Sequence, residues 1–400
     1  MKKVLIVVAT LMMLVTMVGC SSSNETPSNS SDGEEDQSTV QVIKVGGSGP
    51  LTGGAAIYGN AVKNAAEIAV EEVNALGGDI QFELNFQDDM HDTDAAVTAF
   101  GNLVDWGMQI SLSCVTSAPA ANVSPLYAEN QIFALTPSAS NPTVTFADIN
   151  DEDSAFGNVF QMCFSDPGQG TASATYIKNH NVGSKVGIIY KNDDNYSTGI
   201  YDKFVDEAEN IGLNVVYVGT FDSASETDFS VQLSQAAAAG VDVLFLPIYY
   251  QPAALILDRA NKDGYAPVFF GVDGMDGILG LENFDTSLAE GVYLLTPFDE
   301  NSEDEKTQHF VKTYVEKFGE KPNQFAADAY DCIYALYEAC TNAGVKASMS
   351  NEEICALLVK EFTAMEFDGI TGVSKWIATG EVKKDPLAVV IKDGAYASAE

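Results

Sequence analysis

Short runs of β-branched and aromatic residues alternate with amphipathic segments along the chain from Val42 onward. The run VIKVGGS predicts a strand that ends in a glycine-rich turn. Residues Gly59 to Leu76 carry apolar side chains at intervals of three and four, which predicts a helix that stops at Gly77-Gly78. FELNFQ, MQISLS and IFALT predict the next strands, with helices expected at 93–105 and 119–129. This order of strands and helices is typical of a parallel sheet covered on both faces.

The same alternation starts again at KVGIIY, residues 185–190. The strands predicted after it are NVVYVGTF, VDVLFLP and PVFFGVD, with helices at 196–211, 227–239 and 252–263. The remaining chain predicts helices at 303–318, 324–343 and 350–362, and short strands near 373–377 and 387–392. We therefore predict an α/β fold of two doubly wound parallel-sheet lobes with a cleft between them.

The first twenty residues have a different pattern. Lys2 and Lys3 precede an apolar run that ends at Gly19-Cys20, which is typical of an export signal and short for a spanning helix. The ending Val-Gly-Cys resembles the bacterial lipoprotein signal, in which the cysteine receives the lipid. An ordinary secretory signal with a chance cysteine is the alternative. Residues 21–40 are polar, acidic and rich in serine, so we expect a disordered linker there.

The charge of the chain restricts its partners. Twenty Lys and Arg residues stand against 57 Asp and Glu residues, a formal net charge of −37. Nucleic acid and anionic lipid both require clustered basic residues, so we expect neither as a partner. Such a charge keeps a surface protein soluble.

Five cysteines remain beside Cys20, so at least one is unpaired. Cys340 and Cys355 flank a short connection between predicted helices, and a disulfide between them is one interpretation. Five buried thiols that act as small hydrophobic side chains is the other.

Catalytic motifs are scarce. The three histidines stand outside any HExxH spacing, no GxSxG is present, and GGSGPLTGG lacks the spacing of a dinucleotide or phosphate loop. DDMHD at 88–92 clusters acids beside a histidine, but a solvated loop explains it better than a metal site. We therefore expect a binding protein with no cofactor, no metal and no enzymatic activity.

Polar and aromatic residues collect where predicted strands give way to helices, which is where ligands bind in open α/β sheets. Hydroxyls and free N–H groups at helix starts suit a carboxylate. A lone acid after the strand VFFG suits an ammonium group. Together they predict a pocket for a zwitterion, with these candidates: Tyr58, Thr116, Ser117, Ser138, Ala139, Ser140, Tyr196, Tyr249, Tyr250 and Asp273.

A family resemblance rests on motifs that occur in a fixed order. They are PLTGGAAIYGNAVKNAAEIAVEEVNALGG, TSAPA with LTPSASNP, DDNYSTG, IYYQPA and FFGVDG. The chain resembles, from about Val42 to its end, the solute-binding proteins of branched-chain amino-acid ABC importers, the leucine/isoleucine/valine-binding family with the type I periplasmic binding protein fold.

The resemblance implies roles for individual residues. Ser117 and Ser140 match the hydroxyls that bind the ligand carboxylate, and the backbone around Ser138 helps to fix the α-amino and carboxylate groups. Asp273 matches the ammonium-binding acid, at which the amino-acid binders carry a longer Glu, so its pairing is direct with a shifted ligand or passes through water. The cleft aromatics match four positions: Tyr58, Tyr196, Tyr250 and Phe325.

Two positions depart from the family pattern. DDNYSTG has Ser-Thr where a glycine commonly follows the tyrosine. His91 stands where some relatives have a cysteine paired to the equivalent of Cys114, so we expect that disulfide to be missing.

The resemblance also implies the organisation and the partners. We expect lobe 1 to comprise 41–164 and 296–368, and lobe 2 to comprise 165–295 and 369–400, with three hinge crossovers. The function implied is capture of an amino acid by hinge closure and delivery to an ABC permease, by a monomer held through the lipid on Cys20 at the outer face of the cell membrane.

Three alternatives remain. The same bilobal domain serves ligand sensors that signal to a membrane partner. The ligand is open between a branched-chain amino acid, another amino acid and a small amide. A surface hydrolase on the same tether lacks any recognisable nucleophile and base.

Overall fold

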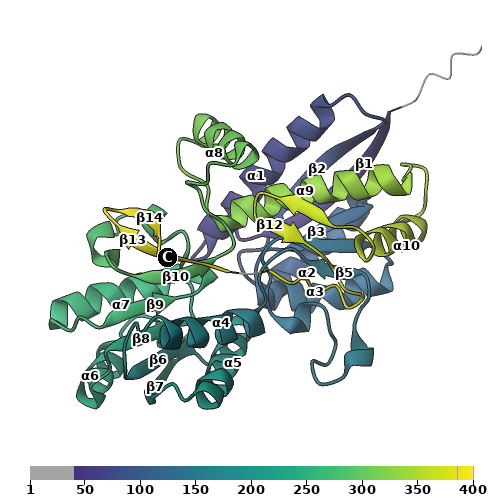
Figure 1. Cartoon of the computed structure of the whole chain (residues 1–400). Coiled ribbons are helices and arrows are strands. Elements are labelled where there is room, and N and C mark those ends of the chain that lie inside the picture. Colours follow the sequence, from purple (N-terminus) through teal and green to yellow (C-terminus); the bar gives the residue numbers. More distant parts are fainter. Residues whose placement is uncertain (1–39, 385, 400) are drawn as a thin grey trace, which may run out of the picture. The chain divides into compact units, whose positions relative to one another are not determined.

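The computed structural model describes residues 40–384 and 386–399. The export signal, Cys20 and the linker as far as residue 39 lie outside the described residues. The described chain contains two large sheets, each with helices around it, and a small hairpin (Figure 1).

The first sheet is entirely parallel, in the order β2-β1-β3-β4-β5. Its strands are β1 (Gln41–Gly49), β2 (Ile80–Asp88), β3 (Ile110–Cys114), β4 (Phe133–Thr136) and β5 (Val159–Gln161). The helices on it are α1 (Ala56–Ala75), α2 (Thr93–Trp106), α3 (Ser117–Glu129), α9 (Gln324–Ala343) and α10 (Asn351–Phe362). Helix α1 packs against α9 and α2 against α3, in two separate hydrophobic clusters. We call this sheet and its helices the first half.

The second sheet has seven strands in the order β14-β13-β10-β9-β8-β6-β7. They are β6 (Val186–Lys191), β7 (Val215–Phe221), β8 (Val243–Leu246), β9 (Val268–Gly271), β10 (Tyr293–Thr296), β13 (Leu387–Lys392) and β14 (Ala395–Ser398). The helices on it are α4 (Asp166–Asn179), α5 (Asn195–Ile211), α6 (Ser230–Ala239) and α7 (Tyr250–Asp263). We call this sheet and its helices the second half.

The two doubly wound sheets confirm the predicted fold class, with one difference at an edge. Strands β7, β6, β8, β9 and β10 are parallel, but β13 pairs antiparallel with β10, and β14 pairs antiparallel with β13. A hairpin turn with Gly394 at φ 73° joins β13 to β14, and such a short connection permits only antiparallel pairing. Helix α8 (Glu305–Phe318) and the hairpin β11 (Phe367–Gly369) and β12 (Gly372–Ser374) follow β10 in the chain.

The sequence pattern missed helix α4, whose segment DPGQGTASATYIKN carries few large apolar residues. Ser165 caps its start by accepting from the N–H of Gly168, and a proline occupies the first turn. A Cβ atom at Gly170 would collide with the carbonyl oxygen of Ile200 in α5. The glycine therefore lets α4 and α5 pack closely, and this packing holds a helix that its own periodicity does not predict.

The disulfide considered between Cys340 and Cys355 is not formed. All five cysteines of the described residues are free and buried. Cys340 points into the hydrophobic core and is fully buried, while Cys355 is 7% exposed and lies beside Asn158. Helices α9 and α10 therefore pack through apolar contacts, and the thiols act as small hydrophobic side chains.

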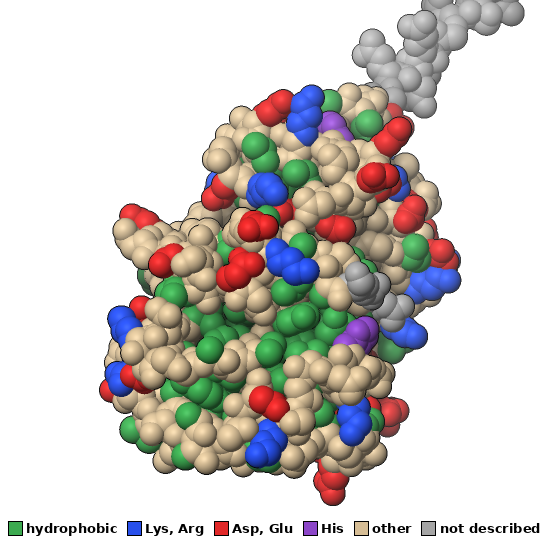
Figure 2. Space-filling view, turned by 60° about the vertical axis from the view of Figure 1, so that its left-hand side comes forward, with side chains coloured by type: hydrophobic (Ala, Val, Ile, Leu, Met, Phe, Trp, Pro, Cys, Tyr) green, Lys and Arg blue, Asp and Glu red, His purple; other side chains and the backbone are tan. Residues whose placement is uncertain are grey.

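Charged side chains are distributed over the surface. Figure 2 shows acidic and basic groups scattered over the visible face, with hydrophobic side chains concentrated across its lower half. Within residues 40–384 and 386–399, no helix is both long and apolar enough to cross a membrane.

Candidate ligand-binding site

A small cavity lies where strands of both halves end. Its volume is about 10 Å³, the room that one water molecule needs. The first half contributes residues of α1, of the β3–α3 junction, of the loop after β4 and of α9; the second half contributes the starts of α5 and α7 and the turn after β9. The lining residues are Tyr58, Val115, Thr116, Ser117, Ser138, Tyr196, Tyr249, Asp273, Gly274 and Phe325.

The wall from the first half carries hydroxyl groups at a helix start. Ser117 is the first residue of α3, and its Oγ accepts the N–H of Ser140 at 3.2 Å and of Asn141 at 3.3 Å. Because these two bonds use the lone pairs of Oγ, its own proton is free to be donated. The Oγ of Ser138 donates to the carbonyl of Val115 at 2.5 Å. Ser117 is therefore the hydroxyl oriented to donate to an anionic group in the cavity.

The wall from the second half carries one acid. Asp273 follows β9, is 3% exposed, and its Oδ1 accepts the hydroxyl proton of Tyr196 at 2.6 Å. Burial raises the pKa of Asp273 to about 7, against the opposing effect of hydrogen bonds from Tyr196 and Gly274. A positive group placed here would favour the ionised carboxylate, so this wall suits a cation.

Four aromatic rings surround this acid and the hydroxyls. The ring of Tyr58 lies 4.5 Å from that of Phe325 and 5.3 Å from that of Tyr249, measured between centroids. Tyr196 stacks on Tyr249 at 4.8 Å. The site thus has an aromatic enclosure between its two polar ends.

The structure places three candidates behind the cavity wall. Tyr250 packs edge-to-face on Tyr58 at 5.0 Å, and its hydroxyl accepts the N–H of Ile57 at 3.3 Å. Ala139 and Ser140 are fully buried, and the carbonyl of Ser140 accepts the N–H of Asp166 at 3.0 Å.

Tyr249 lines the cavity in the position that the sequence interpretation gave to Tyr250. Tyr249 has extended backbone angles as the N-cap of α7, whereas Tyr250 is the first residue of the helix. The change of backbone direction at the cap sends the two rings to different sides. The sequence predicted that the two tyrosines after this strand lie near the site, and the exact position of the helix cap determines which of their rings faces the cavity.

The departures from the family pattern have structural partners. The Oγ of Ser197 donates to the carbonyl of Pro247 at 2.6 Å and accepts the N–H of Lys191 at 2.9 Å, so it ties the start of α5 to the ends of β6 and β8. Cys114 is a free thiol 3.3 Å from the Oγ of Ser48. The Nδ1 atom of His91 lies 2.8 Å from Oγ1 of Thr116, and its ring stands edge-on to Tyr249 at 5.6 Å.

The acids of DDMHD have local partners as well. Asp88 accepts from Thr52 at 2.7 Å, Asp89 from Ser48 at 2.9 Å, and Asp92 caps α2. Among residues 40–384 and 386–399, no group of three or more His, Cys, Asp and Glu side chains is arranged to hold a metal ion.

Direct contacts join the two halves around the cavity. The hydroxyl of Tyr58 donates to the carbonyl of Gly274, and the Nδ2 of Asn141 donates to the carbonyl of Asn195 at 2.7 Å. The N–H of Gln324 donates to Oδ2 of Asp276 at 2.9 Å. These bonds close the site from solvent on several sides.

Comparison with known proteins identifies the family. The sequence model of the periplasmic binding proteins matches residues 42–394. The chain belongs to this family. The curated relatives of this periplasmic binding protein include Leu/Ile/Val-binding protein homolog 1 of Brucella abortus (strain 2308). That relative is 26% identical over 301 residues, which cover 74% of this chain and 77% of the relative. The predicted resemblance to the leucine/isoleucine/valine-binding family is confirmed.

Solved structures confirm the fold. The branched-chain amino acid transporter substrate binding protein of Streptococcus pneumoniae, in complex with isoleucine, is 25% identical, with a TM-score of 0.79, 90% coverage of this chain and 98% of that chain. A solute binding protein from Rhodopseudomonas palustris in complex with benzoate shares the fold at 19% identity and a TM-score of 0.76, with 90% and 95% coverage. The periplasmic binding protein type I fold is therefore common to chains whose bound ligands differ.

Proposed function

We propose that this protein is the solute-binding subunit of an ABC importer, that it captures an amino acid of the branched-chain type, and that it delivers it to a membrane permease. One observation carries the proposal: a free hydroxyl on Ser117 and the lone acid Asp273 face one cavity from opposite halves. An amino acid carries a carboxylate and an ammonium group on one carbon. The two polar walls match those two groups.

Each end of the ligand has a binding partner in this proposal. The carboxylate accepts from Ser117 and from N–H groups at the start of α3, where the helix dipole favours an anion. The ammonium group pairs with Asp273, which Tyr196 holds in place through its hydroxyl. Apolar side chains of leucine size lie against the rings of Tyr58, Tyr249 and Phe325, which exclude water and strengthen the charge pairing.

Binding requires the two halves to separate and close again. The cavity of about 10 Å³ admits no amino acid while Tyr58 is bonded to Gly274. Hinge closure over a ligand is the motion that such two-part proteins use. We propose that an amino acid docks first on the hydroxyls of the first half, and that the second half then brings Tyr196, Tyr249 and Asp273 over it.

The predicted lobes 41–164 with 296–368 and 165–295 with 369–400 supply the hinge in this proposal. Contacts near the third crossover favour a later position than 369. Trp376 donates its ring N–H to the carbonyl of Gln161 in β5 at 2.7 Å and packs on Phe362 at 4.8 Å. Trp376 also forms an antiparallel β-bridge with Val382, so we place this crossover after Val382.

We also propose that Cys20 carries a lipid that holds the protein at the outer face of the cell membrane. The signal-like first twenty residues and the acidic segment at 21–40 support this part of the proposal. A tether keeps the binding domain near its permease, while the segment lets it reorient. Metabolic labelling with a fatty acid tests this step, because a Cys20→Ser chain should take up no label.

A thermal-shift screen of amino acids, small amides and carboxylates tests the proposed function. We expect a branched-chain amino acid to raise the melting temperature of the purified protein, because a ligand that binds only the folded state stabilises it. The Asp273→Ala variant should lose this response, with a loss of about 2–5 kcal/mol of binding free energy for a truncated charge pair. A response restricted to ligands without an amine would contradict the proposal.

A further inference from the structure

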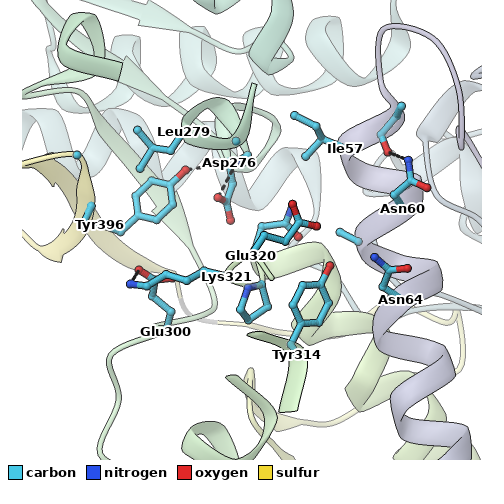
Figure 3. Close-up of a pocket in the computed structure, with 18 residues that line it drawn as sticks. Ile57, Asn60, Asn64, Asp276, Leu279, Glu300, Tyr314, Glu320, Lys321 and Tyr396 are labelled. Carbon is cyan, nitrogen blue, oxygen red and sulfur yellow. Dashed lines mark hydrogen bonds and ion pairs between the residues drawn. The ribbon is translucent and has the colours of Figure 1, made fainter. Parts of the chain in front are cut away.

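A larger cavity lies beside the closed cleft. Its volume is about 770 Å³, which is in the range of small-molecule sites. Both halves line it: α1 and the loop before α9 come from the first, and the turn after β9 and strand β14 from the second (Figure 3). A ligand bound here would bridge the two halves.

The two cavities share a thin wall. Ile57, Asp276 and Asn323 line the larger cavity, while their near neighbours Tyr58, Asp273 and Phe325 line the cleft. Three separate elements therefore contribute to both cavities. The larger one is nevertheless a distinct space, since no lining residue is common to the two cavities.

The charged side chains that line the larger cavity are mostly acidic. Asp276, Glu300 and Glu320 line the cavity together with one basic residue, Lys321. The Nζ of Lys321 is already paired with Oε1 of Glu300 at 2.8 Å. In the part of the chain that the structure describes, neither Asp276 nor Glu320 makes an ion pair, and Figure 3 shows Glu320 directed into the cavity. The cavity therefore holds two carboxyl groups without a cationic partner.

Asp276 is the more unusual of the two. It is 4% exposed, and each of its carboxyl oxygens accepts one backbone N–H, from Gly277 at 2.8 Å and from Gln324 at 2.9 Å. Burial raises the pKa of Asp276, and the charge of Glu300 raises it further. The hydroxyl of Tyr396 also hydrogen-bonds to this carboxyl, and a carboxylate still has room for a further donor. A buried acid of this kind is stabilised by a cation.

The rest of the wall suits an organic ion better than a bare metal ion. Ile57, Leu279 and Pro322 supply apolar surface, and the rings of Tyr314 and Tyr396 add aromatic surface at which an ammonium group can lie. Asn60 and Asn64 present amide groups from α1 (Figure 3). We propose that this cavity is a second binding site, which takes a small organic ammonium ion with an apolar body.

Calorimetry with 2-phenylethylammonium chloride tests the proposal, with 2-phenylethanol and 3-phenylpropanoate as the matched neutral and anionic probes. We expect the amine to bind the purified protein, and the alcohol and the acid to bind at least about tenfold more weakly, because only the amine gains the Coulomb term. Binding of the amine should weaken as salt is added. Equal binding of amine and alcohol, or no binding of the amine, would overturn the proposal.

Variants locate the site. Glu320 is exposed, so the Glu320→Lys variant should fold normally. Because it reverses a charge at the site, it should weaken amine binding by about tenfold or more, and Glu320→Gln, which only removes the charge, should weaken it several-fold. Glu316→Gln is the matched control, since Glu316 lies on α8 outside the cavity and pairs with Lys312. Asp273→Asn separates this proposal from the proposed function: it should leave amine binding intact while it strongly weakens amino-acid binding. Loss of amine binding in Asp273→Asn but not in Glu320→Lys would place the amine in the cleft and refute the second site.

Discussion

Binding of an amino acid should expel a proton from Asp273. In the closed structure its carboxyl is 3% exposed, and burial raises its pKa to about 7. An ammonium group beside it stabilises the ionised form and lowers the pKa. A ligand that arrives when the carboxyl is protonated must therefore release the proton to the buffer.

The size of the effect follows from that pKa. With a pKa of about 7, the carboxyl is about 90% protonated at about pH 6 and about 10% protonated at about pH 8. If the bound ligand lowers the pKa by about two units or more, binding releases about 0.8–0.9 proton at the lower pH and about 0.1 at the higher. The affinity should then be about tenfold weaker at about pH 6 than at about pH 8, which corresponds to about 1.4 kcal/mol.

Calorimetry in two buffers of different ionisation enthalpy measures the released proton directly. We expect the apparent binding enthalpy of the wild-type protein to depend on the buffer at about pH 6 and hardly at all at about pH 8. In the Asp273→Asn variant, residual binding should show no such dependence at either pH. Proton uptake, or an enthalpy independent of the buffer at the lower pH, would refute the assignment of Asp273 to the ammonium group.

Three further predictions concern stability and the aromatic wall. The melting temperature of the free protein should rise as the pH falls from about 8 to about 5, because a carboxyl with a raised pKa in the folded state contributes stability that is lost as pH rises through that pKa. Asp273→Asn should make this profile less steep, while buried acids such as Asp89 and Asp328, with pKa values raised to about 6, keep part of the slope. An unchanged slope in Asp273→Asn would contradict the raised pKa of Asp273. Lys384→Met should lower the free energy of unfolding in urea by about 3–5 kcal/mol. The substitution leaves the buried carboxylate of Asp328 without the Nζ of Lys384, which lies 2.9 Å from its Oδ1. A loss below about 1 kcal/mol would show that the pair is dispensable. In calorimetry, Tyr249→Ala should weaken amino-acid binding by about 1–2 kcal/mol, whereas Tyr250→Phe should cost about 1 kcal/mol or less, and the reverse order would favour Tyr250 as the ligand-facing ring.

The sequence predicted the strongly periodic elements well. The helix expected at Gly59 to Leu76 is α1, Ala56–Ala75, and the strand 42–48 is β1, Gln41–Gly49. In these segments the spacing of the apolar residues directly predicts which face of the helix or strand is buried. Helix α4 was missed because Gly170 serves close packing on α5, which depends on the partner helix and not on the local pattern.

The candidate site was predicted at the level of strand ends. The topology of a parallel sheet brings the carboxyl ends of its strands to one edge, so residues such as Ser117, Tyr196 and Asp273 meet although they lie far apart in the chain. The pattern of apolar and polar residues could not predict the direction of individual side chains. Tyr249 is the N-cap of α7 and Tyr250 is the first residue of the helix, so local backbone angles decide which ring faces the cavity. Local backbone angles also place Ser140 behind Ser117, to whose Oγ its N–H donates.

The larger cavity left no signal in the sequence. Asp276, Glu320 and Tyr396 line this cavity from three separate segments, and the sequence around each of them carries no motif that points to a binding site. Only the folded arrangement shows that two of these residues are acids without a cationic partner.

The recognition of both charged ends of one amino acid is the central claim, and a comparison of three ligands of the same shape tests it most directly. Calorimetry should compare L-leucine, which carries both groups, with 4-methylpentanoate, which lacks the amine, and 3-methylbutylamine, which lacks the carboxylate. We expect L-leucine to bind, and each analogue to bind at least about a hundredfold more weakly, since each leaves one buried polar wall without its partner. Binding of 4-methylpentanoate as tight as that of L-leucine would contradict the role of Asp273, and with it the account of the cleft.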